Sequence, residues 1–340
     1  MILNIISLPF VNKTLKKSPI ILVDCGAAGG IDSMFKDITK LNETISYGFE
    51  ASPREFLKLK NEKNIKYFSS AISSSSGIKD FYVHKTDGSL TLPKKFNKKK
   101  INKIKVKVKT IDDLVKNKTL LEAPNVIKTD LEGHDFYALY GAKKSIKNNT
   151  LAIKSEIFWD SKSKNGGFGK IHDFLIENDF VLFGITYEHS YLGNFTSADV
   201  LYLKSIDKII VSKKSFEKKR SNILKLILLS VSLNLYEYAQ VIILKAKKNK
   251  IISSVEFNKL RKIILKKNYL PNIFSKNSFF EKLSLIIFYI STIFAGENYR
   301  KKSIPKYNQI KRPNFLFKNI LGHSRKQNHL ISKFIKNDNK

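Results

Sequence analysis

Two glycine-containing acidic segments hold most of the residues in this chain whose types and spacing can do chemistry. The first is VDCGAAGGID, residues Val23 to Asp32, which follows an apolar run and consists mainly of small residues. Small residues let a backbone bend sharply and approach a ligand at contact distance. The second segment is VIKTDLEGHD, residues Val126 to Asp135, another apolar run that ends in acids. Both patterns predict strands that end at a ligand site.

A third acid, Glu50, follows Tyr47-Gly48-Phe49 at the position expected for the end of the next strand of a βαβ unit. An acid at that position can accept hydrogen bonds from both hydroxyls of a ribose. The spacing therefore predicts a nucleoside-type cofactor across the carboxyl ends of a parallel sheet. The glycine spacing is not G-x-G-x-x-G, which makes an NAD site the less favoured alternative. The expected cofactor-binding residues are Asp24, Gly26, Ala27, Gly30, Glu50, Ser70 and Ala71.

Short apolar runs alternate with amphipathic ones over residues 20–205, which predicts a doubly wound α/β domain of the Rossmann-like type. The last two strands are joined by a loop short enough for a hairpin, so the sheet is expected to be mostly parallel with an antiparallel last strand. Lysines alternate with valines over residues 105–109, as in an edge strand with one wet face. The expected strands cover residues 20–23, 46–50, 67–72, 79–84, 103–110, 126–130, 151–158, 180–187 and 198–203, and the expected helices residues 33–41, 53–63, 136–146 and 169–178.

The composition changes after residue 205. Helices are expected over residues 221–246, 253–267 and 279–295, separated by Lys-rich or Asn-rich joints. Of the formal net charge of +33, the larger part lies here, because residues 206–340 hold 30 Lys and Arg against 7 Asp and Glu. We therefore divide the chain into an N-terminal extension (1–19), an α/β domain (20–205), a basic helical appendage (206–300) and a basic tail (301–340).

The motifs DCGAAGG, GFEASP, VKVKTIDDL and VIKTDLEGHDFYALYGA resemble those of the FkbM family of S-adenosylmethionine (SAM)-dependent methyltransferases. The resemblance covers residues 20–204 and implies a class I methyltransferase sheet, SAM as the cofactor, and O-methylation of a hydroxyl on a sugar, glycan or secondary metabolite. In that setting Asp24 is expected near the methionine end of SAM, where it would orient the ammonium group either directly or through the turn. Ser70 and Ala71 are expected at the adenine edge. Where the family pattern commonly has Glu, this chain has the shorter Asp135.

The acids after the 126–130 strand are expected to face the acceptor. A hydroxyl acceptor must lose its proton, and Asp130, Glu132 or His134 could take it. A purely structural role stays open, since Glu132 and Asp135 could simply stabilise the start of the next helix. Oxygen ligands for a divalent metal are also present in Asp130, Glu132 and Asp135. Acids gather in this way at ordinary helix starts, and we expect no metal.

Three residues are expected to contact the substrate: Asp135, Glu156 and Trp159. Glu156 ends the next strand and could bind substrate hydroxyls, or it could be a solvated strand end. Trp159, the only tryptophan, could stack on a sugar ring or pack in the core.

Composition limits the remaining possibilities. The single cysteine, Cys25, rules out a disulfide framework and a cysteine-based metal site within one chain. No apolar stretch has the length of a membrane-spanning helix, so a cytoplasmic protein is expected. The basic C-terminal region could dock on an anionic partner, which could be a membrane surface, an acidic glycan or a nucleic acid.

Two other functions remain open. An RNA methyltransferase could use basic segments with interleaved aromatics such as Tyr299, Tyr307, Phe315 and Phe317. A non-catalytic protein could use the helical appendage to recruit a partner or to lie on a membrane. The oligomeric state is not indicated by the sequence.

Overall fold

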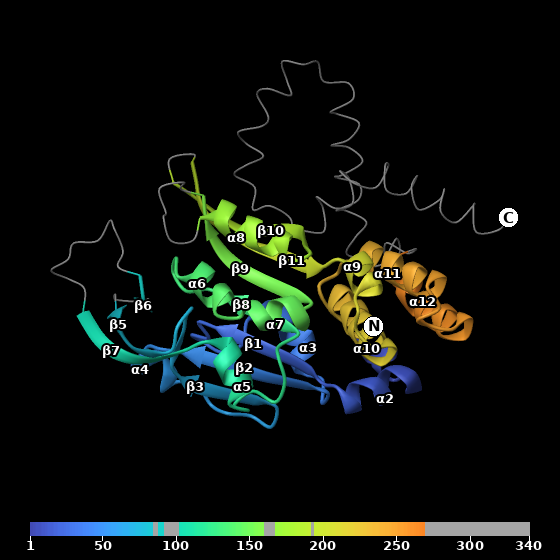
Figure 1. Cartoon of the computed structure of the whole chain (residues 1–340), viewed down its shortest axis with the longest axis horizontal. Coiled ribbons are helices and arrows are strands. Elements are labelled where there is room, and N and C mark those ends of the chain that lie inside the picture. Colours follow the sequence, from blue (N-terminus) through green and yellow to red (C-terminus); the bar gives the residue numbers. More distant parts are fainter. Residues whose placement is uncertain (84–87, 92–101, 160–166, 192–193, 269–340) are drawn as a thin grey trace, which may run out of the picture. The chain divides into compact units, whose positions relative to one another are not determined.

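A seven-stranded sheet forms the centre of the computed structural model, which describes residues 1–83, 88–91, 102–159, 167–191 and 194–268. Its strand order is β10-β11-β9-β8-β1-β2-β3 (Figure 1). The pairs among β3, β2, β1, β8 and β9 are parallel, and β11 is antiparallel to both of its neighbours. The predicted doubly wound, mostly parallel sheet with an antiparallel last strand is confirmed. Its strands are β1 (Ile20–Cys25), β2 (Thr44–Glu50), β3 (Ile65–Ser69), β8 (Val126–Thr129), β9 (Ala152–Phe158), β10 (Phe180–Tyr191) and β11 (Asn194–Lys204).

A second, four-stranded sheet has the order β4-β7-β5-β6 and lies near the carboxyl ends of the main strands (Figure 1). The expected alternation is present in β7, where Val106 and Val108 are buried and the alternating Lys105, Lys107 and Lys109 are exposed. The prediction of an edge strand was wrong, because β7 pairs with β5 along its length and with β4 at its end. The strands of this small sheet are β4 (Ala71–Ile72), β5 (Gly77–Val83), β6 (Gly88–Ser89) and β7 (Asn102–Lys109).

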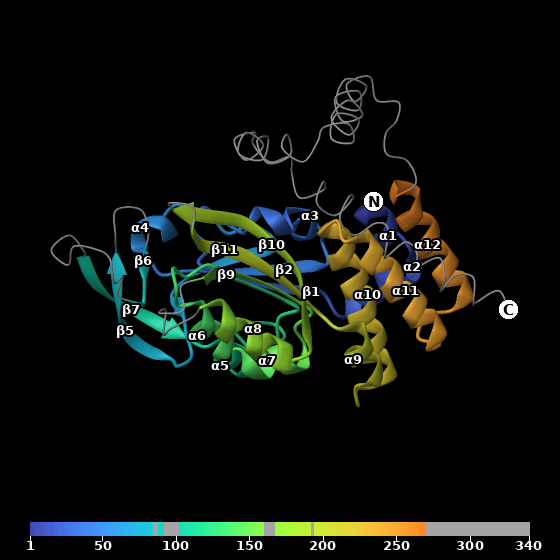
Figure 2. The same ribbon diagram turned by 90° about the horizontal axis from the view of Figure 1, so that it is seen from above.

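Alternate side chains of the parallel strands pack on opposite faces of the main sheet, as the period of two requires. Ile21, Val23, Ile127 and Ile153 belong to one buried cluster. The helices that cover this face lie together below the sheet in Figure 2. They are α5 (Ile111–Lys116), α6 (Asp135–Tyr140), α7 (Lys143–Asn148) and α8 (Phe168–Glu177).

The opposite face carries Leu22, Val126 and Ala152, which belong to a second cluster together with residues from both ends of the described chain. The N-terminal extension and residues 206–268 therefore share a hydrophobic core with the sheet, so the division made from composition does not mark separate cores. The elements of this layer are α1 (Ile2–Ile6), α2 (Pro9–Lys17), η1 (Ser33–Phe35), α3 (Lys36–Thr39), α9 (Ile206–Val211), α10 (Phe216–Ser232), α11 (Tyr236–Lys248) and α12 (Ser254–Asn268).

Several predicted elements have other bounds in the structure. The helix expected over 53–63 is only α4 (Pro53–Phe56), and the strand expected over 67–72 is divided between β3 and β4 in different sheets. The helix expected over 136–146 is divided into α6 and α7 at Gly141. The backbone of Gly141 packs closely on Ser73, because a Cβ on Gly141 would lie 2.1 Å from the Ser73 carbonyl oxygen. The helix expected over 221–246 is α10 and α11, separated by Asn234 with φ of 59°.

Some expectations lie outside the described residues. They are the helix over 279–295 and the basic tail with its aromatic residues. Among the described helices, none is both long enough and apolar enough to span a membrane.

One buried lysine connects the C-terminal helices of this layer with the segment between α2 and β1. Lys225 of α10 is fully buried, and its Nζ donates hydrogen bonds to the Ser18 hydroxyl (2.9 Å), the Pro19 carbonyl (2.8 Å) and Asn125 Oδ1 (3.0 Å). Burial, with a further contribution from Lys218, lowers the pKa of Lys225 from its ordinary 10.5 to about 7. Folding therefore releases a proton from Lys225 at any pH between these two values.

We expect this proton release to make stability rise with pH. Between pH 7 and 9 the unfolded chain keeps the Lys225 proton and the folded chain loses it, so the free energy of unfolding gains on the order of 2 kcal/mol. Lys225→Met has no such proton, so the unfolding free energy of wild type minus that of Lys225→Met should rise by on the order of 2 kcal/mol over that range. Urea unfolding at both pH values measures this signed difference, with the exposed Lys213→Met as the matched control. A signed difference that stays constant or falls would contradict the assignment.

Candidate functional site

A cavity of about 500 Å³ lies at the carboxyl ends of the central strands. It lies where the chain order of the sheet reverses, between β1 and β8, which is the usual ligand position in doubly wound folds. Its volume is within the usual range for small-molecule and cofactor sites. Eight of the residues predicted from sequence line it: Gly26, Gly30, Glu50, Ser70, Ala71, Asp130, Glu132 and His134.

Five predicted site residues do not line the cavity: Asp24, Ala27, Asp135, Glu156 and Trp159. The side chains of three of them lie in the protein interior, away from solvent: Asp24, Ala27 and Asp135. The ring of Trp159 packs on Phe168 at 4.9 Å between centroids, as a core side chain does. None of these five residues contacts the cavity directly.

The glycine turn has the conformation that its sequence predicts. Gly26, Gly29 and Gly30 all have positive φ, at 84°, 79° and 109°. Gly26 also packs against the loop after β8, because a Cβ there would lie 2.1 Å from the Asp130 carbonyl oxygen. The amides of Gly26 and Ala27 both donate to the Phe49 carbonyl, at 2.9 and 3.1 Å. The turn is therefore bound to the end of β2, which carries Glu50.

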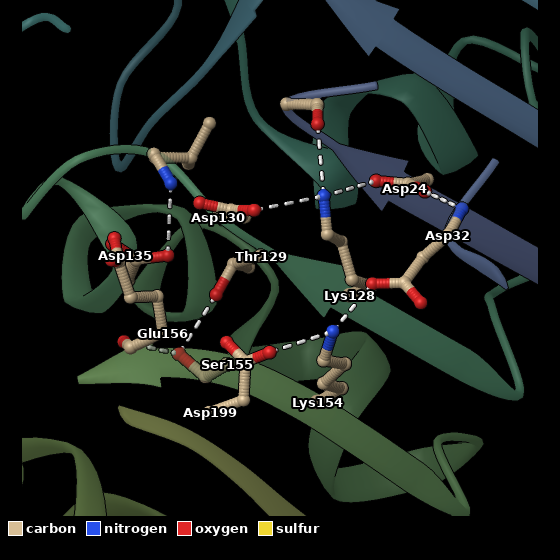
Figure 3. A network of polar contacts seen from close by, with 12 residues as sticks. Asp24, Asp32, Lys128, Thr129, Asp130, Asp135, Lys154, Ser155, Glu156 and Asp199 are labelled. Atoms are coloured by element: carbon tan, nitrogen blue, oxygen red, sulfur yellow. Dashed lines mark hydrogen bonds and ion pairs between the residues drawn. The ribbon is translucent and has the colours of Figure 1, made fainter. Parts of the chain in front are cut away.

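Lys128 of β8 is the residue that sequence reasoning missed. Its side chain is only 5% exposed, and its Nζ lies 2.8 Å from the Gly26 carbonyl oxygen, 3.1 Å from Asp24 Oδ1 and 3.6 Å from Asp130 Oδ2 (Figure 3). Burial alone would lower the pKa of Lys128, but the charges of Asp24 and Asp130 outweigh it and raise this pKa above its ordinary value. An ammonium group thus connects the glycine turn with residues 130–134 between β8 and α6, which we call the acidic loop.

Lys154 of β9 makes a second connection of the same kind. It is paired in register with Lys128, which is itself paired with Asp24, so the three side chains form a polar row across the sheet. Nζ of Lys154 lies 2.5 Å from Asp32 and 2.9 Å from Asp199 of β11 (Figure 3). The Asp32 amide in turn donates to Asp24 Oδ2 at 2.8 Å. Both ends of the glycine turn are therefore held by buried ion pairs.

These contacts change the interpretation of Asp24. Burial raises its pKa, and the charge of Lys128 acts against that increase. Both of its oxygens are directed to groups of the protein, Lys128 and the Asp32 amide. Asp24 does not line the cavity, so of the two expected roles these contacts favour the one through the turn over direct contact with the cofactor.

Further carboxyl groups lie behind the acidic loop. The Asp135 and Glu156 side chains lie close together (Figure 3). Burial is the largest cause that raises the pKa of both above their ordinary values, and the charges of neighbouring acids add to it. At Asp135 a hydrogen bond from Thr129 acts against this increase. Oxygens of Asp130, Glu132 and Glu156 also lie within 4.8 Å of one another. An acidic cluster alone does not identify a metal site, and a proton retained on Glu156 relieves the repulsion equally well.

His134 is partly buried at the edge of the cavity, between two hydroxyl groups, those of Ser73 and Thr91. Burial and the charge of Lys79 lower its pKa from 6.5 to about 4. The imidazole is therefore neutral at physiological pH.

Residues 24–182 match the methyltransferase FkbM domain. Over these residues the chain is similar to the FkbM methyltransferases. The resemblance inferred from the motifs is confirmed, together with the methyltransferase fold. No curated protein matches the chain.

Solved structures show only a distant likeness. Methyltransferase FkbM from Methylobacillus flagellatus KT is 16% identical, with a TM-score of 0.34, and the match covers 54% of this chain and 43% of that one. Magnesium protoporphyrin IX methyltransferase from Synechocystis PCC 6803, solved with bound SAM, is 10% identical, with a TM-score of 0.31 and 58% and 76% covered. An rRNA methylase from Streptococcus thermophilus is 11% identical, with a TM-score of 0.30 and 57% and 94% covered. These similarities are too low to bear on the acceptor.

The glycine turn of the FkbM domain offers a matched pair of variants. Gly26→Ala and Gly29→Ala both force alanine to a positive φ, which costs on the order of 1–2 kcal/mol. Only at position 26 does the new Cβ collide with backbone, whereas at position 29 no atom lies within 4 Å. We expect Gly26→Ala to lose at least about 2 kcal/mol more unfolding free energy than Gly29→Ala, measured by urea denaturation. Equal losses would show that the close packing on Asp130 is unimportant.

Proposed function

We propose that this protein is a SAM-dependent O-methyltransferase that acts on a hydroxyl of a sugar, a glycan or a small hydroxylated metabolite. The observation that carries the proposal is a single cavity lined both by a glycine turn with a buried ribose-type acid and by an acidic loop. The first set of residues suits the cofactor and the second suits an acceptor hydroxyl.

The cofactor side of the cavity fits SAM. Gly26 and Gly30 leave the turn without side chains, so a ligand can approach the backbone closely. Glu50 is 6% exposed, lines the cavity at the end of β2, and has one carboxylate oxygen fixed by the Ser52 amide at 2.6 Å. We assign Glu50 to the ribose hydroxyls, and Ser70 and Ala71 to the adenine edge. When bound, SAM supplies an electrophilic methyl group on a sulfonium centre.

The acceptor side is the loop after β8. Asp130 is 46% exposed at its side chain, and it lines the cavity together with Glu132. A carboxylate within hydrogen-bond reach of an acceptor hydroxyl can take its proton as the methyl group is transferred. The negative charge of this loop also favours the positively charged sulfonium. We assign proton acceptance to Asp130, with Glu132 beside it. Asp135 and Glu156 support this loop from the buried side.

The two other functions stay open as predictions. An RNA acceptor and a docking role both rest on the basic C-terminal region, and most of its distinguishing residues lie outside the described part of the chain. The intact cavity lining favours an enzyme over a protein that only docks.

Glu50 provides the sharpest test of the cofactor assignment. Glu50→Gln keeps the size of the side chain and removes the charge that strengthens its hydrogen bonds to two hydroxyls. We expect the dissociation constant for SAM, measured by calorimetric titration at pH 8, to rise about tenfold or more. Glu43→Gln, a glutamate remote from the cavity lining, serves as the control. Equal SAM affinity of Glu50→Gln and wild type would remove Glu50 from the site.

The same assignment sets the sign of the pH dependence. Burial, the largest cause, raises the pKa of Glu50 above its ordinary 4.5. Because the ionised form is the one that accepts both hydroxyl hydrogen bonds, SAM affinity should weaken as the pH falls through this raised pKa. Titrations at several acidic pH values, with folding checked by circular dichroism, should show the loss in wild type and not in Glu50→Gln.

A further inference from the structure

His134 was expected to be a proton acceptor, and its surroundings in the structure favour another role. Nε2 lies 2.9 Å from the Ser73 hydroxyl and Nδ1 lies 2.9 Å from the Thr91 hydroxyl. A neutral imidazole has one N–H donor and one acceptor nitrogen. Both are therefore used by hydroxyl groups of the protein, which can donate or accept as needed. The ring also packs on Tyr137, with 4.9 Å between centroids.

The two hydroxyl partners come from different parts of the small sheet. Ser73 follows β4, whereas Thr91 follows β6. Neither residue lines the cavity, although His134 does. An effect of either hydroxyl on a ligand in the cavity must therefore pass through His134 or through the segments that it joins.

Residues 88–91, which we call the wall segment, form one side of the cavity through Gly88, Ser89 and Leu90. The Ser89 hydroxyl donates toward the Leu131 carbonyl at 2.9 Å and the Glu132 carbonyl at 3.2 Å. The Thr91 amide donates to the Ser89 hydroxyl at 3.0 Å. With the Thr91–His134 contact, these bonds fasten the wall segment to the acidic loop at both of its ends.

The acidic loop needs such support because its backbone is strained. Glu132 has φ of 52°, a left-handed conformation that is unfavourable for a residue with a Cβ, and Gly133 follows with φ of 84°. Strained residues of this kind persist only where surrounding contacts hold them. His134 comes directly after this pair and is the residue before α6.

We infer that His134 is a positioning residue, a neutral connector that uses both ring nitrogens to hold the acidic loop and the wall segment in the arrangement that forms the ligand cavity. The identity of the ligand, SAM, comes from the proposed function. The connection between the two segments depends only on the contacts described above. This role leaves Asp130 and Glu132 as the candidates for proton acceptance.

Three variants test the connector. His134→Gln keeps a donor and an acceptor at the end of the side chain, His134→Leu removes both, and Ser73→Ala combined with Thr91→Val removes the two hydroxyl partners. Ser75→Ala, an exposed serine in the same turn as Ser73, is the matched control. Hydrogen–deuterium exchange of residues 88–91 and 130–135 reports the connection, and calorimetric titration with SAM reports the cavity.

We expect His134→Leu and the double variant each to raise exchange in both segments about tenfold and to weaken SAM binding. Adding the double variant to His134→Leu should produce no further loss, because both remove the same contacts. His134→Gln should restore most of the protection and affinity, and Ser75→Ala should match wild type.

If hydrogen–deuterium exchange of residues 88–91 is unchanged in His134→Leu, the inferred role of His134 is wrong. The same conclusion follows if the losses of protection and SAM affinity add up when His134→Leu is combined with the double variant. The proposed function fails separately, if folded wild-type protein does not bind SAM, and the exchange measurements still decide the connection in that case.

Discussion

A buried ammonium group on the central strand of the sheet holds the candidate site together. Lys128 touches the first carbonyl of the glycine turn, the acid that ends β1, and the acid that begins the acidic loop. Removing one partner from a buried ion pair usually costs several kcal/mol, because the other charge is left uncompensated. The turn, the loop and the strands between them are therefore constrained as one unit, and Lys154 extends that unit to β11 through Asp32 and Asp199.

The layering of the protein explains why these charges can be buried there. On one face of the sheet, Leu22, Val126 and Ala152 pack against helices from both ends of the described chain. Two residues further along the same strands, Asp24, Lys128 and Lys154 replace that apolar row with a polar one. The change from apolar to polar occurs where the helices give way to the cavity. Charges that pair with each other there support the turn without filling the space that a cofactor needs.

Local patterns predicted the strands, the hairpin, the glycine turn and the cavity position of Glu50 and Asp130, because each depends on neighbouring residues and on where parallel strands end. They failed where distant contacts decide. Asp24 stood at the expected strand end, but its partner Lys128 is far along the chain, so the sequence could not decide whether Asp24 acts directly or through the turn. Gly141, where α6 ends, packs against the backbone of Ser73, a residue far away in sequence. A lysine within each of two buried strands, VIKT and AIKSEIF, was the available signal for the ion pairs.

The most direct test of this account is the SAM affinity of Asp24→Asn, which keeps the shape of the side chain and removes its charge. Asp24 does not line the cavity, so any effect must act through Lys128 and the turn. The account predicts that the protein stays folded by circular dichroism and that the dissociation constant for SAM rises at least about tenfold. A folded Asp24→Asn protein that binds SAM as tightly as wild type would contradict it.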